Sequence, residues 1–581
     1  MALVVALLTL QSPDVGPEPT LPPTIDGQAT AALQGELAGV APERAPGSAE
    51  DQAAAKWVLG QLQQIPGATG KVQTQDLVAR ADGAAVNLQN IYLAVPGSVG
   101  ASRRPGIVVI APRDTPPGVA AGSSSTAVLL SLARYSASSR HERPHLFVST
   151  DGSTLGNAGV RWFLTRFSGF PLAAAIVLDA PGEATGDRFH IWTDGRADRQ
   201  AIRLGAIAER SVEAVGGRTA GAPSLTGQML RMAVPQTFGE QGAVIAAGLP
   251  AVTLSGRAES PLRPGAEVTA ERLQLAASAA NHLLGALDAA PTVPAPDQGV
   301  EFAGKILRPT VSRIALLLLA LPVLVLAVDA VAALRRARVR MVPALRTVGL
   351  RSIPLFAALI AAHLLSLAGL LPREAGGAPP LPGDARFGAA AGLGLVLAVG
   401  AGLLAWLWAR RRIEGHGAPP AAEGVAALGA LAVLMVVLWL ASPFALVLAL
   451  PVAHAALIAS VARRGWQLVA LAAVAALPVL LLLLSLAGRL DSNIVFAGWY
   501  LLATAASGAR GATGLVLAVL VLACVWSIGS LLSFRARKLG LAAGPLSPAH
   551  PGRREARARL RLRVRVERRP RPARRRGRPG G

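Results

Sequence analysis

The hydrophobic pattern divides the chain into two parts near residue 300. In the first part, residues 107–111 and 146–149 have the continuous apolar character of buried strands. A Pro- and Gly-rich loop lies between them and leads into a helix that begins with serines at 123–125, and another helix follows the second strand. We predict a parallel strand–helix–strand unit. Its loops gather at the carboxyl ends of the strands, where α/β proteins keep their functional residues.

The flanking segments extend this pattern. Residues 41–62 predict a turn and a helix, residues 86–97 a strand, residues 173–179 and 251–254 two buried strands, and residues 268–287 a closing helix. We therefore expect residues 24–288 to form an α/β domain with a mixed central sheet flanked by helices. The Pro-rich residues 289–298 break the pattern, so a linker is expected at residues 289–311.

Seven apolar runs of membrane-spanning length follow the linker. They lie at residues 312–334, 348–371, 387–409, 424–441, 443–462, 466–488 and 512–534, and each approaches the length of a helix that crosses about 30 Å of hydrocarbon. Of the 581 residues, 52% are hydrophobic and 4% aromatic, which excludes a soluble globule. We predict a polytopic α-helical domain in the cell membrane.

Positive charges predict the orientation of these helices. Basic residues cluster in alternate loops, at residues 335–346, 410–412, 463–464 and 535–538. The positive-inside rule then makes the C-terminal tail cytoplasmic and the residues before 312 extracytoplasmic. An odd number of spans requires one more helix at the N-terminus. We expect residues 1–10 to be the end of a truncated membrane helix, followed by a Pro-rich linker to residue 23; the alternative is a short start that spans nothing.

Charge and cysteine content restrict the partners. The net charge is +23, and about half of the excess lies at residues 553–578, within the arginine-rich tail at residues 535–581. We expect this tail to be disordered and to contact anionic lipid headgroups rather than a specific nucleic acid. The single cysteine, Cys524, excludes an intrachain disulfide and a thiolate metal cluster.

Several motifs in the first part carry a family resemblance. They are the turn Arg44-Ala-Pro-Gly-Ser48, the loop Asp151-Gly-Ser-Thr-Leu-Gly-Asn-Ala-Gly159, the strand end Leu178-Asp179, and Glu240-Gln241 with the following Gly248-Leu-Pro-Ala251. Together, over residues 41–287, they resemble the zinc exopeptidase family of bacterial leucyl aminopeptidases, glutamate carboxypeptidase and the transferrin receptor ectodomain. The resemblance implies two zinc ions held by imidazole and carboxylate ligands, with a glutamate as general base.

Most of the family's metal positions carry other residues here. The resemblance places Pro112, Ala121, Ser153, Thr154 and Gln241 at ligand or base positions, and only Asp114 and Asp179 keep a carboxylate. One ligand and one orienting carboxylate cannot hold two zinc ions. The loop glycines are nevertheless present, at Gly152, Gly156, Gly159 and Gly248. We predict a catalytically inactive domain without metal or other cofactor. Its candidate pocket residues are Asp114, Asp151, Ser153, Thr154, Asp179, Glu240 and Gln241.

Three functions remain open. The extracytoplasmic domain could bind a peptide or protein partner as a scaffold. The chain could instead be a membrane-bound zinc aminopeptidase with a non-standard site, or a transporter or transferase subunit that uses its helices. The layout is similar to that of the attachment subunit of the eukaryotic GPI transamidase. That resemblance includes no motif in the membrane half, and the Ala- and Arg-rich composition indicates a bacterial source, so the reaction is not carried over.

Other polar residues of the first part have ordinary explanations. The serines at 123–125 are expected to cap their helix. His141 and His145 have the spacing of metal ligands, but Pro144 interrupts any helix between them, so we expect both histidines in a loop.

Ionisable residues within apolar runs are functional hypotheses by default, and Asp329, His363 and His454 are such residues. Asp329 could also reach the membrane interface, and we expect His363 to hydrogen-bond a neighbouring helix. Residues 492–507, which include Trp499 and Tyr500, predict an interfacial or re-entrant helix, with a loop as the alternative.

Overall fold

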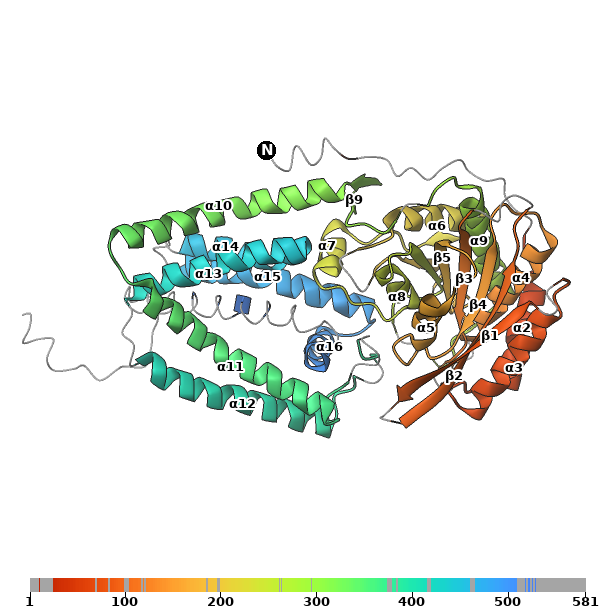
Figure 1. Ribbon diagram of the computed structural model, residues 1–581, viewed down its shortest axis with the longest axis horizontal. Helices are drawn as coiled ribbons and strands as arrows, with labels where there is room; N and C mark the ends of the chain where they lie inside the picture. Colours follow the sequence, from red (N-terminus) through yellow and green to blue (C-terminus); the bar gives the residue numbers. More distant parts are fainter. Residues whose placement is uncertain are drawn as a thin grey trace, which may run out of the picture.

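The computed structural model places a sheet domain and a bundle of apolar helices end to end (Figure 1). It describes residues 10, 24–67, 71–81, 84–98, 104–115, 119, 122–183, 186–195, 199–260, 262, 264–293, 295–302, 304–373, 379–382, 385–414, 419–459, 465–508, 518, 521, 522, 525 and 528. The expectations for the N-terminal helix and its linker, for the last apolar run and for the arginine-rich tail therefore lie almost entirely outside the described residues.

The sheet domain is built on eight strands in the order β1-β2-β4-β3-β5-β8-β6-β7. The strands are β1 (Val72–Ala81), β2 (Ala84–Val95), β3 (Gly106–Pro112), β4 (His145–Thr150), β5 (Leu172–Asp179), β6 (Arg188–Trp192), β7 (Arg218–Thr219) and β8 (Ala251–Ser255). β3 is parallel to β4 and β5, and β5 to β8, whereas β2 runs antiparallel to β4 and β6 to β8. The mixed central sheet expected from the sequence is thus confirmed.

Helices flank the sheet on both faces (Figure 1). One face is covered by α2 (Gly27–Val40), α3 (Ala49–Gln63), α4 (Ser123–Ser138), α6 (Ile202–Ala214) and α9 (Ala270–Ala289). The other carries α5 (Ala158–Arg166) and α8 (Glu240–Ala246), and α7 (Leu225–Ala233) lies between the sheet domain and the bundle. The predicted strand–helix–strand unit is β3-α4-β4, and both strands are buried along their whole length. Burial on two faces explains why their sequences are continuously apolar.

The second part of the chain is helical. Its elements are α10 (Pro309–Arg336), α11 (Met341–Leu367), α12 (Ala389–Glu414), α13 (Pro420–Ala441), η3 (Pro443–Ala445), α14 (Leu446–Ala459), α15 (Gly465–Arg489) and α16 (Ile494–Ser507). Among the described residues, α10 to α13 and α15 are the five helices long and apolar enough to cross a membrane. Of the seven predicted spans, the fifth corresponds to η3 and the shorter α14. Residues 494–507 form a helix, not a loop.

The bundle exposes apolar side chains that a soluble protein would bury. Val328 of α10, Leu404 of α12 and Val469 of α15 are each about 70% exposed, at 70%, 69% and 71%. Continuous apolar surface of this kind needs a nonpolar surrounding, which for helices of this length is the interior of a bilayer. The chain is therefore a multi-pass membrane protein that also carries a mixed-sheet α/β domain.

The connection between the two parts differs from the predicted linker. Strands β9 (Val300–Phe302) and β10 (Lys305–Leu307) form a hairpin within residues 289–311. The Gln228 side chain of α7 fixes this hairpin. It accepts a 2.7 Å hydrogen bond from the amide of Glu301 and donates one of 3.2 Å to the Glu301 carbonyl. Residues 289–311 are thus partly structured. No local sequence pattern predicts the pairing of β9 with β10, because the contacts of Gln228 that support it form only in the folded chain.

The ionisable residues of the bundle make local contacts. His363 Nδ1 of α11 lies 2.9 Å from the carbonyl of Ala506 in α16, which confirms a hydrogen bond between helices. His454 Nδ1 lies 2.9 Å from Leu450 O of its own helix. Asp329 lies 3.6 Å from Arg336, and both side chains are exposed.

Candidate functional site

Three carboxylates lie near the carboxyl ends of three parallel strands. Asp114 follows β3, Asp151 follows β4, and Asp179 is the last residue of β5. Since these strands are neighbours in the sheet, the residues that follow them meet at one edge. The structure thus brings these three predicted pocket residues to the same edge.

Asp114 holds the loop between β4 and α5. Its Oδ1 accepts a 2.8 Å hydrogen bond from the amide of Ser153, and its Oδ2 accepts bonds of 2.9 and 2.8 Å from the amide and hydroxyl of Thr154. Gly152 and Gly156 adopt φ values of +70° and +69° in this loop, which favour glycine. Ser153 and Thr154, which were expected to occupy degenerate ligand or base positions, therefore both donate hydrogen bonds to Asp114.

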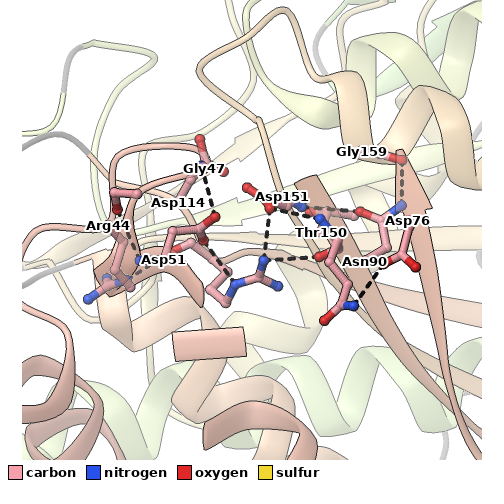
Figure 2. Close-up of polar contacts among 12 residues, drawn as sticks. Arg44, Gly47, Asp51, Asp76, Asn90, Asp114, Thr150, Asp151 and Gly159 are labelled. Atoms are coloured by element: carbon pink, nitrogen blue, oxygen red, sulfur yellow. Dashed lines mark hydrogen bonds and ion pairs between the residues drawn. The ribbon is translucent and has the colours of Figure 1, made fainter. Parts of the chain in front are cut away.

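A buried arginine connects the ends of β3 and β4. Arg113 has Nε at 3.2 Å from Asp51 and Nη2 at 3.0 Å from Asp151, and Figure 2 shows both ion pairs. Arg44 of the family turn donates a 2.8 Å hydrogen bond to the Arg113 carbonyl. Burial raises the pKa of Asp151 to about 7, although the Arg113 guanidinium opposes that rise. One buried guanidinium, that of Arg113, thus pairs with two buried carboxylates.

Asp179 is paired in the same way. Its Oδ2 lies 2.9 Å from Nη2 of Arg257, which follows β8, and Arg257 Nε lies 3.4 Å from the fully buried Glu183. Burial raises the pKa of Asp179, and the Arg257 cation opposes the change. The Arg257 guanidinium therefore occupies the side of Asp179 that faces β8.

The serines at the start of α4 do not cap that helix, contrary to expectation. The residue before α4 is Gly122, which provides no side-chain cap. Ser125 Oγ instead accepts a 2.8 Å hydrogen bond from the amide of Ala180, and Ser124 Oγ one of 3.1 Å from Gly182. The hydroxyls thus hold the loop that follows Asp179, because its amides need acceptors when they are buried.

The side chains at the start of α8 also make hydrogen bonds within the domain. Gln241 is fully buried; its Nε2 donates a 2.9 Å hydrogen bond to Thr237 Oγ1, and its Oε1 accepts one of 2.8 Å from Thr253. The Glu240 carboxylate accepts a 2.8 Å hydrogen bond from Thr150 Oγ1. Gln241 therefore uses its side-chain amide as both donor and acceptor, so both of its polar atoms are already occupied by contacts within the chain.

A chain of polar contacts runs from Gln241 to the membrane helices. Thr237, the partner of Gln241, donates a short hydrogen bond to Glu259, and the same carboxylate pairs with Arg489 at the end of α15. Arg489 also lies 3.7 Å from Asp194. Glu259, Arg489 and Asp194 have side chains at most 8% exposed.

The second carboxylate of this chain is ionised. Asp194 lies 2.7 Å from Arg231 of α7, which stands between the sheet domain and the bundle. Burial opposes ionisation of Asp194, but Arg231 and Arg489 outweigh it and lower its pKa. The sheet domain is thus joined to the bundle by buried, paired charges.

The residues at this edge do not fit a two-zinc centre. Pro112, the last residue of β3, has no donor atom for a metal, and Ala121 lies outside the described residues. The carboxylates of Asp114, Asp151, Asp179 and Glu240 all accept hydrogen bonds or face guanidinium groups. Within the described part of the chain, no group of three histidine, cysteine or acidic side chains converges here. Zinc would require these contacts to be broken first.

Sequence reasoning missed the basic partners at this edge. Arg113 and Arg257 come directly or shortly after buried strands, and both are at most 6% exposed. The sequence signal for such a partner is an arginine that follows an apolar strand, in a sheet whose other strands are followed by carboxylates. It could have suggested an internal ion pair, though not which carboxylate takes part.

His141 lies in the connection before β4, as expected, whereas His145 does not lie in a loop. His145 is the first residue of β4, and its ring stacks on that of His141 with the centroids 4.1 Å apart. Pro144 directly precedes the strand. These histidines are at the amino end of β4, opposite the edge that carries Asp151.

Comparison with protein-family models and with curated proteins found no match. Similar solved structures include a Zn-dependent exopeptidase from Parabacteroides distasonis (14% identity, 45% of this chain and 99% of that chain, TM-score 0.34). They also include the glutaminyl cyclase of an Acidobacteriales bacterium (18% identity, 47% and 98%, TM-score 0.36) and a zinc aminopeptidase from Bacillus subtilis (13% identity, 46% and 95%, TM-score 0.35).

Proposed function

We propose that the sheet domain binds a peptide or protein partner and acts as a scaffold on the membrane, without hydrolysing what it binds. The observation that carries this proposal is the ion pair between Asp179 and Arg257, at 2.9 Å. A carboxylate that neutralises a buried guanidinium is a poor zinc ligand, since binding the metal would leave that cation unpaired. The site is a degenerate exopeptidase centre, and it takes no zinc or other cofactor at this edge.

The attachment of the sheet domain to the bundle supports a scaffold. Arg489 of α15 contacts Glu259 and Asp194 of the sheet domain, and burial shields these charges from solvent. Such a junction holds the domain in one orientation. A partner bound at the loops after β3, β4 and β5 would therefore be presented at a fixed position relative to the helices.

The sheet domain is proposed to be extracytoplasmic. In Figure 1, the carboxyl ends of α10 and α12 lie at the end of the bundle away from the sheet domain, and both end in arginines: Arg335, Arg336, Arg411 and Arg412. Basic residues favour the cytoplasmic side. The same rule makes the arginine-rich tail cytoplasmic, where anionic lipid headgroups are its proposed partner and no specific nucleic acid is involved. The layout resemblance to the GPI transamidase subunit adds no reaction to this proposal.

Hydrolysis is tested with the full-length protein in detergent. Purified wild type and the variant Asp179→Asn are assayed on a panel of aminoacyl nitroanilides with added zinc, and their bound metal is measured. We expect no turnover, and the same metal content in both proteins. Turnover that a chelator removes and that Asp179→Asn abolishes would establish the zinc aminopeptidase instead.

Binding is tested by photocrosslinking in intact membranes. A photoreactive amino acid is placed at Ser153, on the loop after β4, and in a matched protein at Val78, a 66% exposed residue of edge strand β1. Partner crosslinks are expected from position 153 and not from position 78. Equal yields from both positions, or none from 153, would contradict a binding role for this edge.

A further inference from the structure

Three potential metal ligands converge at the opposite end of the sheet from Asp179. His145 begins β4, Asp288 lies in the last turn of α9, and His141 lies in the connection before β4. One nitrogen or oxygen atom of each lies within 4.8 Å of the corresponding atoms of the other two. The three residues come from separate segments, so only the folded domain brings them together.

Hydrogen bonds orient all three side chains. His141 Nδ1 lies 2.7 Å from the Arg143 carbonyl, which can only accept, so Nδ1 holds the proton and Nε2 keeps a free lone pair. His145 Nδ1 lies 2.9 Å from the Ser136 hydroxyl. Metal-binding histidines are commonly held in this way through the second ring nitrogen.

The carboxylate of Asp288 is held by backbone amides. Its Oδ1 accepts a 2.6 Å hydrogen bond from Arg143 N, and its Oδ2 accepts one of 2.8 Å from Glu142 N. These bonds fix the carboxylate beside the loop that carries His141. Each oxygen of a carboxylate has further lone-pair capacity, so the amides do not exhaust it.

The Nε2 atom of His145 points into this cluster. It lies 3.5 Å from Asp288 Oδ1, which is an ion pair when the ring is protonated, and its side chain is only 5% exposed. A metal ion bound to Nε2 would replace that proton and keep a positive charge beside the Asp288 carboxylate.

We propose that His141, His145 and Asp288 bind one zinc ion. Two imidazoles and one carboxylate form a common zinc ligand set, with water as the fourth ligand. Tetrahedral zinc with bonds of about 2.0–2.1 Å brings its ligand atoms to about 3.3 Å from one another. The ligand atoms must therefore come closer, and the stacked rings, with planes 14° apart, must tilt relative to each other so that both lone pairs point at the metal. His141 makes this movement, because it lies outside the strand that holds His145.

The position of the site gives the metal a structural role. Asp288 immediately precedes the segment that leads through β9 and β10 to α10. Zinc bound here would tie the end of α9 to the start of β4. It would stabilise the sheet domain where the chain leaves it for the membrane. The Arg143 guanidinium contacts the Asp288 carbonyl at 3.3 Å, and its charge limits the affinity.

The test uses the full-length protein in detergent, stripped with a chelator and titrated with Co²⁺ or Zn²⁺. One Co²⁺ per chain is expected, with the absorption of a tetrahedral centre, and Zn²⁺ should raise the thermal midpoint. His141→Phe keeps an aromatic ring in the stack but removes a ligand, so it should weaken binding on the order of 100-fold. His190→Phe, in β6, is the matched control and should bind as wild type does.

Two further measurements keep the outcome decisive. Asp179→Asn must leave Co²⁺ binding unchanged, which separates this site from the edge considered for hydrolysis. Should His141→Phe fail to fold, Asp288→Asn provides the alternative, because it keeps the size of the side chain, removes the anionic ligand and should also weaken Co²⁺ binding. Absence of a tetrahedral signal, or binding that His141→Phe does not weaken, would overturn the proposal.

Discussion

Arg257 Nη2 lies 2.9 Å from Asp179 Oδ2, so the carboxylate at a position that could hold zinc faces a guanidinium from the next strand. The same guanidinium reaches Glu183 at 3.4 Å, and its side chain is 7% exposed. One arginine thus neutralises two carboxylates of the loop after β5. Its role is structural, and it can be tested without any substrate.

Replacing this arginine should destabilise the sheet domain. Arg257→Met leaves Asp179 and Glu183 without their cation, which is expected to cost about 3 kcal/mol. The measurement is chemical denaturation followed by tryptophan fluorescence. Arg218→Met removes an exposed arginine that pairs with Asp187 and should not change the midpoint measurably. Adding Asp179→Asn to Arg257→Met should restore part of the loss; no recovery would argue against the pairing.

The junction between the sheet domain and the bundle should depend on Arg489. Arg489→Met leaves the Glu259 and Asp194 carboxylates buried without this cation. We expect faster hydrogen exchange both at residues 236–241 and at the end of α15, since the two are linked through Thr237. The control is Arg336→Met, whose pair with Asp329 is exposed. Faster exchange in α15 alone would show that the two regions are not coupled.

Glu209 predicts a pH dependence of stability. It lines a small pocket that Glu301 also lines. Burial, together with Glu301 and Glu213, raises the pKa of Glu209 from 4.5 to about 7. Between these values the folded protein keeps a proton that the unfolded chain has released, so stability falls as pH rises through this window.

The substitution Glu209→Gln removes that loss. The variant and wild type should melt at similar temperatures at pH 4.5, and the variant should melt higher at pH 8. Glu36→Gln, on the exposed face of α2, controls for the loss of a surface carboxylate. A Glu209→Gln effect of the same size at both pH values would show that this carboxyl group does not titrate as stated.

Gly159 is required by close packing. A Cβ atom there would lie 2.2 Å from the Asp151 carbonyl oxygen and 2.5 Å from Asn90 Oδ1. Gly159→Ala should therefore destabilise the domain by about 1–3 kcal/mol. Gly60→Ala is the matched control, because Gly60 lies within α3 and a Cβ there meets nothing within 4 Å. This control should stabilise the domain by about 0.5–1 kcal/mol, and both free energies come from denaturant titration.

The sequence predicts the buried parallel strands and the membrane helices well. β3 and β4 are covered on both faces, and α10 is apolar over a length that can cross a bilayer, so their composition alone indicates their environment. Composition does not reveal β1, because Val72–Ala81 form an edge strand with an exposed face. Polar and apolar residues alternate only weakly in such a strand, so its sequence looks like that of a loop.

The candidate site was only partly predictable. The strand-end positions of Asp114, Asp151 and Asp179 follow from the parallel pattern, which brings them to one edge. Their partners do not, because Arg257 is 78 residues away from Asp179 along the chain. The serines at 123–125 show the same limit: their sequence is that of helix caps, and only the folded chain brings Ala180 and Gly182 to their hydroxyls.

The hydrogen bonds of Gln241 restrict how this protein can be altered. Histidine at this position would have to reach Thr237 with one ring nitrogen and Thr253 with the other, and a carboxylate at position 153 would be brought toward Asp114. A metal-binding residue introduced at either position would therefore disturb contacts that already exist. Engineering zinc into this edge would need several substitutions made together, including new partners for the residues that now make these contacts.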